Sequence, residues 1–339
     1  MTRKIKFRRM VSALLSSCGI HSLLERVYLS DRAFVLMYHR ILPSAENQAY
    51  YVQPGMFVTT VTFEQQVAYV RDHFEVVFLD DLVKRALKGA HIGRHCALTF
   101  DDGWRDNYTE AFPVLERYRV PATIFLSTGF VGTPRTFWPE ELCHYLERID
   151  LGTFAGIGAP RSWSRFTGMI GKFQCHGREW FLDRSIETLK AFAPSDREGI
   201  LNYLRSMLGA EPVPRQMLSW EEAREMAHSG LVRFGAHTVN HELLDQLPLH
   251  SARDEISLSR SEIERRLEQK VTAFAYPNGN HSEAVRRIVE EGGFDAAVTT
   301  RKGFLRRGVS FLEVPRIALH EDISTTIPML RSKILLQAF

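Results

Sequence analysis

The sequence predicts an α/β protein, a distorted (β/α) barrel of about seven units with a mainly helical insertion. Short apolar runs recur along the chain, and each is followed by a helical pattern, as in βα units around a parallel sheet. Seven or eight such units within 339 residues favour a closed barrel over an open sheet. Residues 134–218 interrupt this alternation, because they combine helical and Gly-rich stretches without a clear strand.

The elements before the interruption follow in order. Four apolar runs have the length and composition of buried strands: residues 34–38, 76–79, 97–100 and 122–126. Three segments between them have helical periodicity: residues 62–72, 82–88 and 108–118. The first half of the chain therefore supplies about half of the barrel.

The alternation resumes after the insertion. Four more apolar runs read as strands: residues 232–234, 273–276, 296–299 and 314–319. Helical patterns cover residues 220–228, 252–269, 282–291 and 327–337. In the longest of these, residues 252–269, the apolar side chains of Ile256, Ile263 and Leu267 share one face. Gly292-Gly293 provides a stop signal directly after the helix expected at residues 282–291. We expect a barrel over residues 31–325 and a C-terminal helix over 326–339.

Residues 1–30 form a separate basic and amphipathic segment. The apolar stretch from about Met10 to Leu15 is shorter than the core of a secretory signal, which needs roughly 7–15 residues. We therefore expect a cytoplasmic protein, with peripheral membrane contact through residues 1–29; the alternative is export through an atypical signal.

Composition excludes several classes of protein. The 43 basic and 40 acidic residues nearly balance, so nucleic acid is not an expected partner. The four cysteines lie far apart without a C-x-x-C motif, which argues against a disulfide framework or a cysteine zinc site. The nucleophile-elbow, P-loop and dinucleotide-binding glycine motifs are absent from the sequence.

Ligand-type residues follow two of the predicted strands. Asp101 and Asp102 come directly after one strand, and His237 and His241 come shortly after another. The spacing of four predicts that one helical turn places both imidazoles on the same side. One carboxylate and two imidazoles suit Zn²⁺ or a similar divalent ion, and the second carboxylate is then free to act as a base. The alternative is a capped helix start and two unrelated histidines.

These residues resemble a known family. Thr99-Phe100-Asp101-Asp102-Gly103 and His237-Thr238-Val239-Asn240-His241 are similar to the first two motifs of the polysaccharide deacetylases, the NodB-homology carbohydrate esterases of family 4. The resemblance spans roughly residues 30–325, apart from the insertion. It implies a NodB-like barrel and metal-dependent removal of acetyl groups, N-acetyl groups above all, from a polysaccharide or glycan intermediate such as an exopolysaccharide.

The resemblance also assigns roles by motif position. It implies that Asp101 is the general base and that Asp102, His237 and His241 bind the metal. The expected ion is Zn²⁺, with Co²⁺ or another divalent ion as alternatives. The implied substrate is a glycan or a lipid-linked saccharide; the sugar, the acetyl position and the oligomeric state stay open.

The third motif of the family, Arg-x-Pro-x-Gly, is altered. The corresponding stretch has Ala275 in place of the arginine that orients the catalytic aspartate. Arg316 is the candidate replacement as partner of Asp101, and a surface or interface ion pair is the alternative. The Leu-x-His motif appears only loosely, as Ala318-Leu319-His320.

Two histidines compete for the role of general acid. His320 matches the usual position near the end of the barrel, whereas Tyr38-His39 resembles an N-terminal motif of the branch similar to poly-N-acetylglucosamine deacetylases. The altered third motif favours that branch, but both histidines stay candidates. Trp104 and Trp138 are candidates for stacking on sugar rings, with burial in a core as the commoner alternative.

Two other functions fit the same sequence. The missing arginine also suits a catalytically silent carbohydrate-binding module that kept the barrel. A metal-dependent amidase acting on a small non-sugar amide would use the same groups. The deacetylase is the leading hypothesis because its motifs and their strand-end positions agree.

Overall fold

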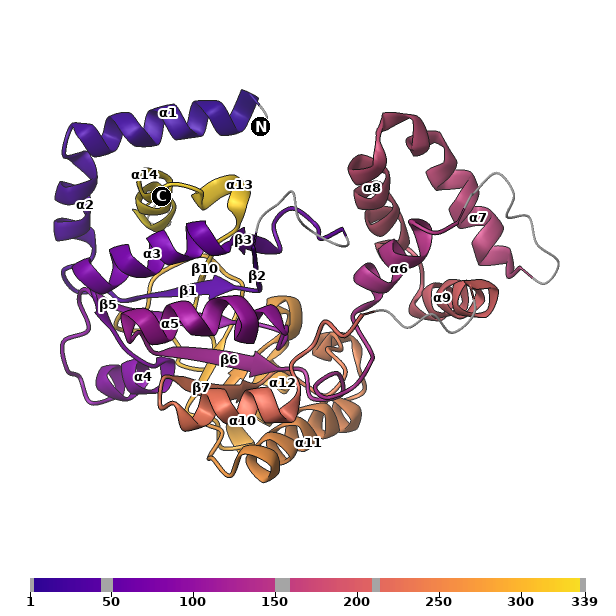
Figure 1. Cartoon of the computed structure of the whole chain (residues 1–339). Helices are drawn as coiled ribbons and strands as arrows, with labels where there is room; N and C mark the ends of the chain where they lie inside the picture. Colours follow the sequence, from indigo (N-terminus) through magenta and orange to yellow (C-terminus); the bar gives the residue numbers. More distant parts are fainter. Residues whose placement is uncertain (1–2, 44–50, 150–158, 209–213, 336–339) are drawn as a thin grey trace. The chain divides into compact units, whose positions relative to one another are not determined.

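The computed structural model describes residues 3–43, 51–149, 159–208 and 214–335. The chain forms two compact units (Figure 1). The first comprises Met1–Ala45, Pro54–Thr133 and Met217–Phe339, and the second comprises Glu46–Gln53 and Pro134–Gln216. Each unit has its own apolar core.

A curled parallel sheet forms the centre of the first unit. Seven strands lie in the order β10-β1-β5-β6-β7-β8-β9, and β4 pairs with β5 beside them. Their bounds are β1 Phe34–Tyr38, β4 Glu75–Val76, β5 His95–Phe100, β6 Ala122–Leu126, β7 Val232–Ala236, β8 Ala273–Ala275, β9 Ala296–Val298 and β10 Ile317–Ala318. The segment entering β10 also forms a parallel bridge from Val314 to Val298 in β9, so it links the two ends of the sheet. The predicted distorted (β/α) barrel is confirmed.

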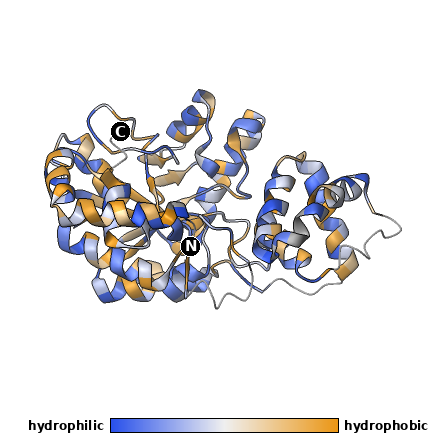
Figure 2. Cartoon of the chain, turned by 90° about the horizontal axis from the view of Figure 1, so that it is seen from above, coloured by the Kyte–Doolittle hydropathy of each residue, from blue (hydrophilic) through white to orange (hydrophobic). Residues whose placement is uncertain are grey.

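Helices surround this sheet (Figure 1). They are α1 Arg3–Ser17, α2 Ile20–Tyr28, α3 Thr60–His73, α4 Leu79–Leu87, α5 Phe112–Tyr118, α10 Trp220–His228, α11 Leu249–Leu267, α12 Glu283–Glu291, α13 Glu321–Ser324 and α14 Ile327–Leu335. Many of these helices have an apolar and a polar side (Figure 2). A short separate pair of strands, β2 Arg40–Leu42 and β3 Phe57–Thr59, lies outside the main sheet.

The strands are apolar on both faces, as expected for a parallel sheet covered by helices. Alternate residues of β1 join different cores: Phe34 and Leu36 pack with one cluster and Val35 with the other. The period of two follows from the pleat of the strand. The second cluster includes Leu79 and Leu82 of α4, so this helix packs with one face of the sheet.

Three predicted elements differ in detail. The strand expected at 76–79 is limited to β4, because α4 already begins at Leu79; Asp80 and Asp81 in its first turn favour a helix start. The helix expected at 108–118 opens with a π-helical turn, Asn107–Ala111, before α5. The strand expected at 314–319 contracts to β10 and the bridge at Val314.

The second unit is helical in its described part, as predicted for the insertion. It contains α6 Trp138–Leu146, α7 Arg161–Ile170, a 3₁₀ turn Gly171–His176, α8 Arg178–Lys190 and α9 Pro194–Leu208. Its core includes Trp163, Phe166 and Leu189. Across both units, none of the helices in the described residues combines the length and apolarity needed to span a bilayer.

Candidate metal and catalytic site

The carboxyl ends of neighbouring strands bring the predicted site residues to one edge of the sheet. Tyr38 at the end of β1 lies opposite Phe100 at the end of β5, so His39 and Asp101 follow side by side. Met37 lies opposite Ala318 of β10, which places His320 at the same edge. In α/β barrels this edge carries the chemistry.

Three donor atoms converge at this edge. Oδ1 of Asp102 lies 3.5 Å from Nε2 of His237 and 3.5 Å from Nε2 of His241. All three ligand atoms lie within 4.8 Å of one another, and no other such group of three occurs among the described residues. A carboxylate and two imidazoles at this spacing suit a divalent cation with positions left for water and substrate.

The loop carrying the two histidines is not helical, which corrects the basis of the prediction. Thr238 and His241 have φ angles of 65° and 57°, in the left-handed region, and Asp102 has a φ of 78°. Such angles in residues other than glycine cost free energy and cluster at functional sites. The imidazoles therefore meet through two left-handed residues and not through one helical turn.

Neighbouring elements hold this loop in place. The Glu255 carboxylate of α11 accepts hydrogen bonds from the backbone amides of Val239 and Asn240, each at 2.8 Å. The side-chain amide of Asn240 donates to the same carboxylate. Ser127, after β6, donates its hydroxyl to the His237 carbonyl at 3.0 Å. Asn240 thus fixes the loop through Glu255.

The backbone of β8 sets the tautomer of His237. Nδ1 of His237 lies 2.7 Å from the carbonyl oxygen of Ala275. A carbonyl only accepts, so Nδ1 carries a proton; in the neutral imidazole the Nε2 lone pair can then bind a cation, and in the protonated form Nε2 can donate to Asp102. Ala275 occupies the position of the missing motif arginine, and its main chain supports a metal ligand in the way that such ligands are commonly oriented.

Trp104 orients the aspartate ligand. Its indole Nε1 donates to Oδ2 of Asp102 at 2.8 Å, which leaves Oδ1 directed at the histidines. The ring is buried beneath the guanidinium of Arg40, 4.2 Å from the ring centroid, and Arg40 is paired with Asp106 at 2.8 Å. A buried ring cannot stack on a sugar, so Trp104 is a core residue, which was the alternative to sugar stacking. In the second unit, Trp138 packs against that unit's core.

Arg316 lies against Asp101 in a bidentate ion pair. Nη1 and Nη2 of the guanidinium donate to the two carboxylate oxygens at 2.7 and 2.6 Å. Nη1 also donates to the Thr99 hydroxyl, and Nε donates to the Thr299 carbonyl. Both charged side chains are buried, so the surface ion pair considered from the sequence is excluded.

The electrostatics keep both carboxylates ionised. Burial alone would raise the pKa of Asp101, but the charge and hydrogen bonds of Arg316 bring that pKa below its usual value. Burial also opposes ionisation of Asp102, yet the His237 hydrogen bond and the neighbouring histidine charges lower its pKa strongly. Two adjacent aspartates therefore carry full negative charge at neutral pH.

The two histidine ligands differ in their titration. Burial would lower the pKa of His237, but its hydrogen bond to Asp102 and the charges of both aspartates raise it. Burial and the charge of His237 lower the pKa of His241 to about 4. His241 is therefore neutral, as a metal ligand must be.

The two candidate acids differ in the charges that act on them and in the groups that their own charges affect. His39 is half-buried, and its charge lowers the pKa values of both Asp101 and Asp102. His320 is also half-buried; burial, together with Lys333 and Arg8, lowers its pKa. Its Nδ1 is buried without a hydrogen-bond partner among the described residues.

Comparison with known proteins agrees with this geometry. The family model of the polysaccharide deacetylases matches residues 88–297, which is more than half of the chain. The chain belongs to the polysaccharide deacetylase family. The predicted family and its hydrolase class are thus confirmed, whereas membership of the branch with the N-terminal Tyr-His motif stays a prediction.

Individual relatives are distant from this deacetylase. YxkH of Bacillus subtilis, which also carries the polysaccharide deacetylase name, is 22% identical over 86% of this chain and 72% of its own length. The poly-β-1,6-N-acetyl-D-glucosamine N-deacetylase of Staphylococcus aureus is 28% identical over 36% of this chain, and the match covers 43% of that enzyme.

Solved structures share the fold. The deacetylase PplD of Streptococcus pyogenes superposes with a TM-score of 0.57 at 20% identity, over 90% of this chain and 97% of that one. IcaB from Ammonifex degensii gives a TM-score of 0.57 at 21% identity over the same shares. At these identities the superposition supports the barrel and not a substrate.

The site of the deacetylase includes residues that the sequence did not single out. Arg40, Asp106 and Glu255 hold Trp104 and the histidine loop through the contacts described above. For Arg40 a signal existed, since it directly follows Tyr38-His39. Glu255 lies in a helix rich in charged residues, and nothing in that pattern distinguishes it.

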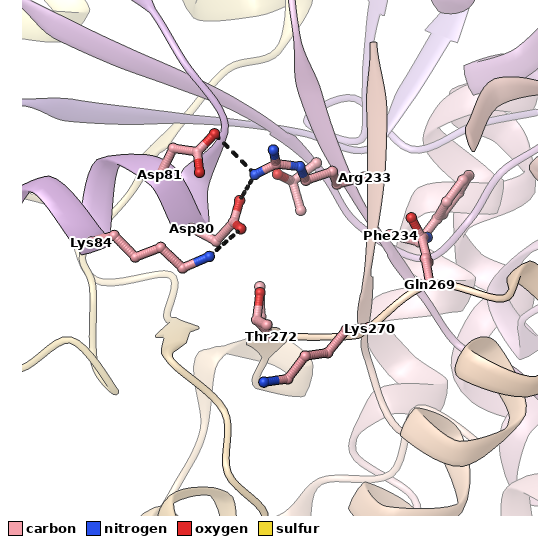
Figure 3. Close-up of a pocket in the computed structure, with 10 residues that line it drawn as sticks. Asp80, Asp81, Lys84, Arg233, Phe234, Gln269, Lys270 and Thr272 are labelled. Atoms are coloured by element: carbon pink, nitrogen blue, oxygen red, sulfur yellow. Dashed lines mark hydrogen bonds and ion pairs between the residues drawn. The ribbon is translucent and has the colours of Figure 1, made fainter. Parts of the chain in front are cut away.

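A second polar site lies at the amino ends of the strands. A pocket of about 300 Å³ is lined by residues at the starts of β6, β7 and β8 and by α4 (Figure 3). Asp80 accepts from Arg233 at 2.6 Å and from Lys84 at 3.1 Å, and Asp81 lies 3.0 Å from Arg233. Each of these carboxylates has a basic side chain as its partner, in contrast to Asp102, whose partners are two imidazoles and an indole N–H.

Proposed function

We propose that this deacetylase removes N-acetyl groups from a polysaccharide or glycan intermediate in a metal-dependent hydrolysis. The observation that carries the proposal is the donor group of Asp102, His237 and His241 beside an Asp101 that is locked to Arg316. The catalytically silent module is not favoured, because Arg316 supplies the partner that Ala275 cannot. Nothing in the site favours a small non-sugar amide.

The donor chemistry fits a divalent ion, for which Zn²⁺ is the best match. Oδ1 of Asp102 and Nε2 of each histidine would hold it. When bound, such an ion supplies carbonyl polarisation and acidifies a water molecule. The Trp104 hydrogen bond and the Ala275 carbonyl orient two of these ligands before any ion arrives.

Asp101 acts as the general base. A carboxylate has about four lone-pair sites, so the two hydrogen bonds from Arg316 leave room to accept a proton from the attacking water. The guanidinium keeps the carboxylate ionised and fixes its orientation. Because the lowered pKa makes Asp101 a weak base in the resting state, its effectiveness depends on position and on an acidified water.

His39 acts as the general acid that protonates the leaving amine. Its position beside Asp101 at the strand edge, and its electrostatic effect on both aspartates, support this assignment over His320. His320 is the alternative. His39→Gln should then reduce turnover about 10²–10⁴-fold, while His320→Gln leaves most activity. The reverse pattern would reassign the acid.

The substrate class rests on chemistry and on relatives. An N-acetyl group linked to an amino sugar provides the carbonyl and the leaving amine that this site can serve. The staphylococcal relative is named for poly-β-1,6-N-acetyl-D-glucosamine, which supports an amino-sugar polymer as substrate. A lipid-linked saccharide is the second candidate.

Acetate release tests the proposal directly. The metal-loaded protein is incubated with β-1,6-linked N-acetylglucosamine oligomers and with a lipid-linked saccharide, with and without chelator. We expect acetate that disappears with chelator and returns with Zn²⁺ or Co²⁺. Asp80→Asn serves as the matched control, since it alters a carboxylate remote from the site. Failure of the loaded protein to release acetate from any glycan would overturn the proposal.

A further inference from the structure

Two N-terminal helices expose matching stripes of apolar side chains. On α1, Phe7, Met10 and Leu14 are 61%, 63% and 62% exposed. On α2, Leu23 and Val27 are 61% and 58% exposed. Residues spaced by three and four lie on one face of a helix, so each stripe is continuous. Large side chains this exposed on two successive helices require an explanation beyond scattered surface residues.

These helices are held firmly by their other faces. Ser332 of α14 hydrogen-bonds to Ser12 of α1 and to His21 of α2, each at 2.9 Å. Arg331 of α14 donates to Ser16 and forms an ion pair with the buried Glu25. α1 and α2 are therefore ordered parts of the first unit, lying beside α14 (Figure 1). Their apolar stripes point away from these contacts.

The apolar stripe of α1 is accompanied by exposed basic side chains of the same helix. Arg3, Lys6, Arg8 and Arg9 of α1 are exposed. The first acidic residue of the whole sequence is Glu25, and its charge is already matched by Arg331. No carboxylate within α1 therefore offsets these four charges.

We propose that the exposed faces of α1 and α2 form a docking surface for an anionic lipid bilayer. Apolar side chains would enter the headgroup boundary, and the basic side chains would contact anionic lipid, as in interfacial helices. A second copy of the chain is a poorer occupant. A symmetric pairing of these faces would bring four like charges from each copy together.

The docking surface lies beside the edge that carries the catalytic site. α1 contacts α13, which begins directly after His320. Arg8 of α1 is close enough to His320 to lower its pKa. Docking through α1 would therefore bring this edge of the barrel near the lipid surface, where lipid-linked or membrane-attached saccharides occur. The proposal concerns attachment alone and does not depend on the deacetylase reaction.

Vesicle co-sedimentation of the full chain tests the proposal. We expect binding to vesicles of phosphatidylcholine with phosphatidylglycerol, weakening with salt, and little binding to pure phosphatidylcholine. The triple variant Phe7→Ser, Met10→Ser, Leu14→Ser should bind at least about tenfold more weakly. Arg3→Gln, Lys6→Gln, Arg9→Gln should lose about fivefold per charge.

Control variants distinguish binding through this surface from nonspecific binding by exposed apolar side chains. Val61→Ser, Leu249→Ser, Leu258→Ser removes three apolar side chains that are more than half exposed elsewhere on the first unit and should leave binding unchanged. Acetate release from a soluble oligosaccharide should be equal in all variants, which keeps this test apart from that of the function. The absence of binding to either vesicle would overturn the proposal. So would equal binding by the stripe variant, or a stripe variant that changes only the oligomeric state.

Discussion

Both ends of the parallel sheet carry a pair of aspartates, but the partners of these aspartates differ between the two ends. At the amino end, Asp80 and Asp81 share Arg233, and Asp80 also meets Lys84. At the carboxyl end, Asp101 meets Arg316, but within the described residues no lysine or arginine is paired with Asp102. The partners of Asp102 are two imidazoles and an indole N–H.

Burial sharpens this difference. Arg233 and Lys84 keep more than a third of their side chains in solvent, so their ion pairs are weak and screened. Arg316 and Asp101 are buried, and removing either partner would leave a charge without compensation. A buried carboxylate that is paired with imidazoles, and not with a lysine or arginine, thus identifies the functional end better than the number of charged residues does.

Replacing one aspartate at each end of the sheet by asparagine should show the difference between the two ends most clearly. Asp101→Asn should lower kcat by about 10²–10⁴-fold, because the amide cannot accept the water proton. Asp80→Asn should leave kcat unchanged. Acetate release and bound-metal content are measured together; full activity in Asp101→Asn would contradict the assignment of the base.

Replacing the arginine at each end of the sheet should affect the stability of the protein to different extents. Arg316→Met leaves Asp101 buried and unpaired, so the free energy of unfolding should fall by roughly 3–5 kcal/mol. Arg233→Met should cost about 0–1 kcal/mol. Urea unfolding of both variants at neutral pH gives the comparison, and equal losses would show that burial does not distinguish the two pairs.

The same pair predicts a pH dependence. The folded-state pKa of Asp101 is lowered, so its stabilisation is present above the unfolded value of about 3.9 and is lost as pH falls through the folded value. The difference in the free energy of unfolding between the parent protein and Arg316→Met should therefore become smaller in acid. A gap that stays constant into strong acid would argue against an ionised Asp101.

Trp104→Phe tests one hydrogen bond of the carboxyl end, the one that Trp104 donates to Asp102. The phenyl ring keeps an aromatic face for Arg40 but cannot donate to Oδ2 of Asp102, so metal affinity should fall about 10–100-fold. Trp220→Phe is the matched control, because this Trp lies in α10, where its ring packs against the Arg266 guanidinium. Zinc competition titration gives both affinities, and equal values would remove Trp104 from the site.

Protons should compete with the metal at His237. The raised pKa of His237 means that its Nε2 holds a proton up to a higher pH than an ordinary histidine. Metal affinity should therefore fall by about tenfold per pH unit below that value, one proton being displaced. His241, with a pKa of about 4, should not contribute near neutrality. Affinity that is independent of pH across the neutral range would contradict this.

The smallest effect is expected at the amino end. Lys84→Met removes an exposed partner of Asp80 while Arg233 remains, so the free energy of unfolding should change by about 0–1 kcal/mol. Activity and metal content should be unchanged. A large loss of either would mean that the two ends of the sheet are coupled.

The sequence was sufficient for features that depend on local pattern. The strand ends and the family motifs pointed to Asp102, His237 and His241, although the helical turn expected between the histidines is absent, and the missing motif arginine pointed to Arg316 as the partner of Asp101. It could not supply features set by contacts distant in sequence. Glu255 binds the histidine loop from a separate helix, and the left-handed angle at Thr238 has no signature in a threonine. Patterns report periodicity, whereas these contacts depend on the folded geometry.

The left-handed backbone at Thr238 has a consequence for redesign. A β-branched residue is disfavoured at a φ of 65°, where glycine or asparagine fits without strain. Thr238→Gly should therefore relieve this strain while the loop keeps the conformation that brings the two imidazoles together. The Thr238 hydroxyl has no hydrogen-bond partner among the described residues, so thermostability can be raised at this loop without moving His237 or His241.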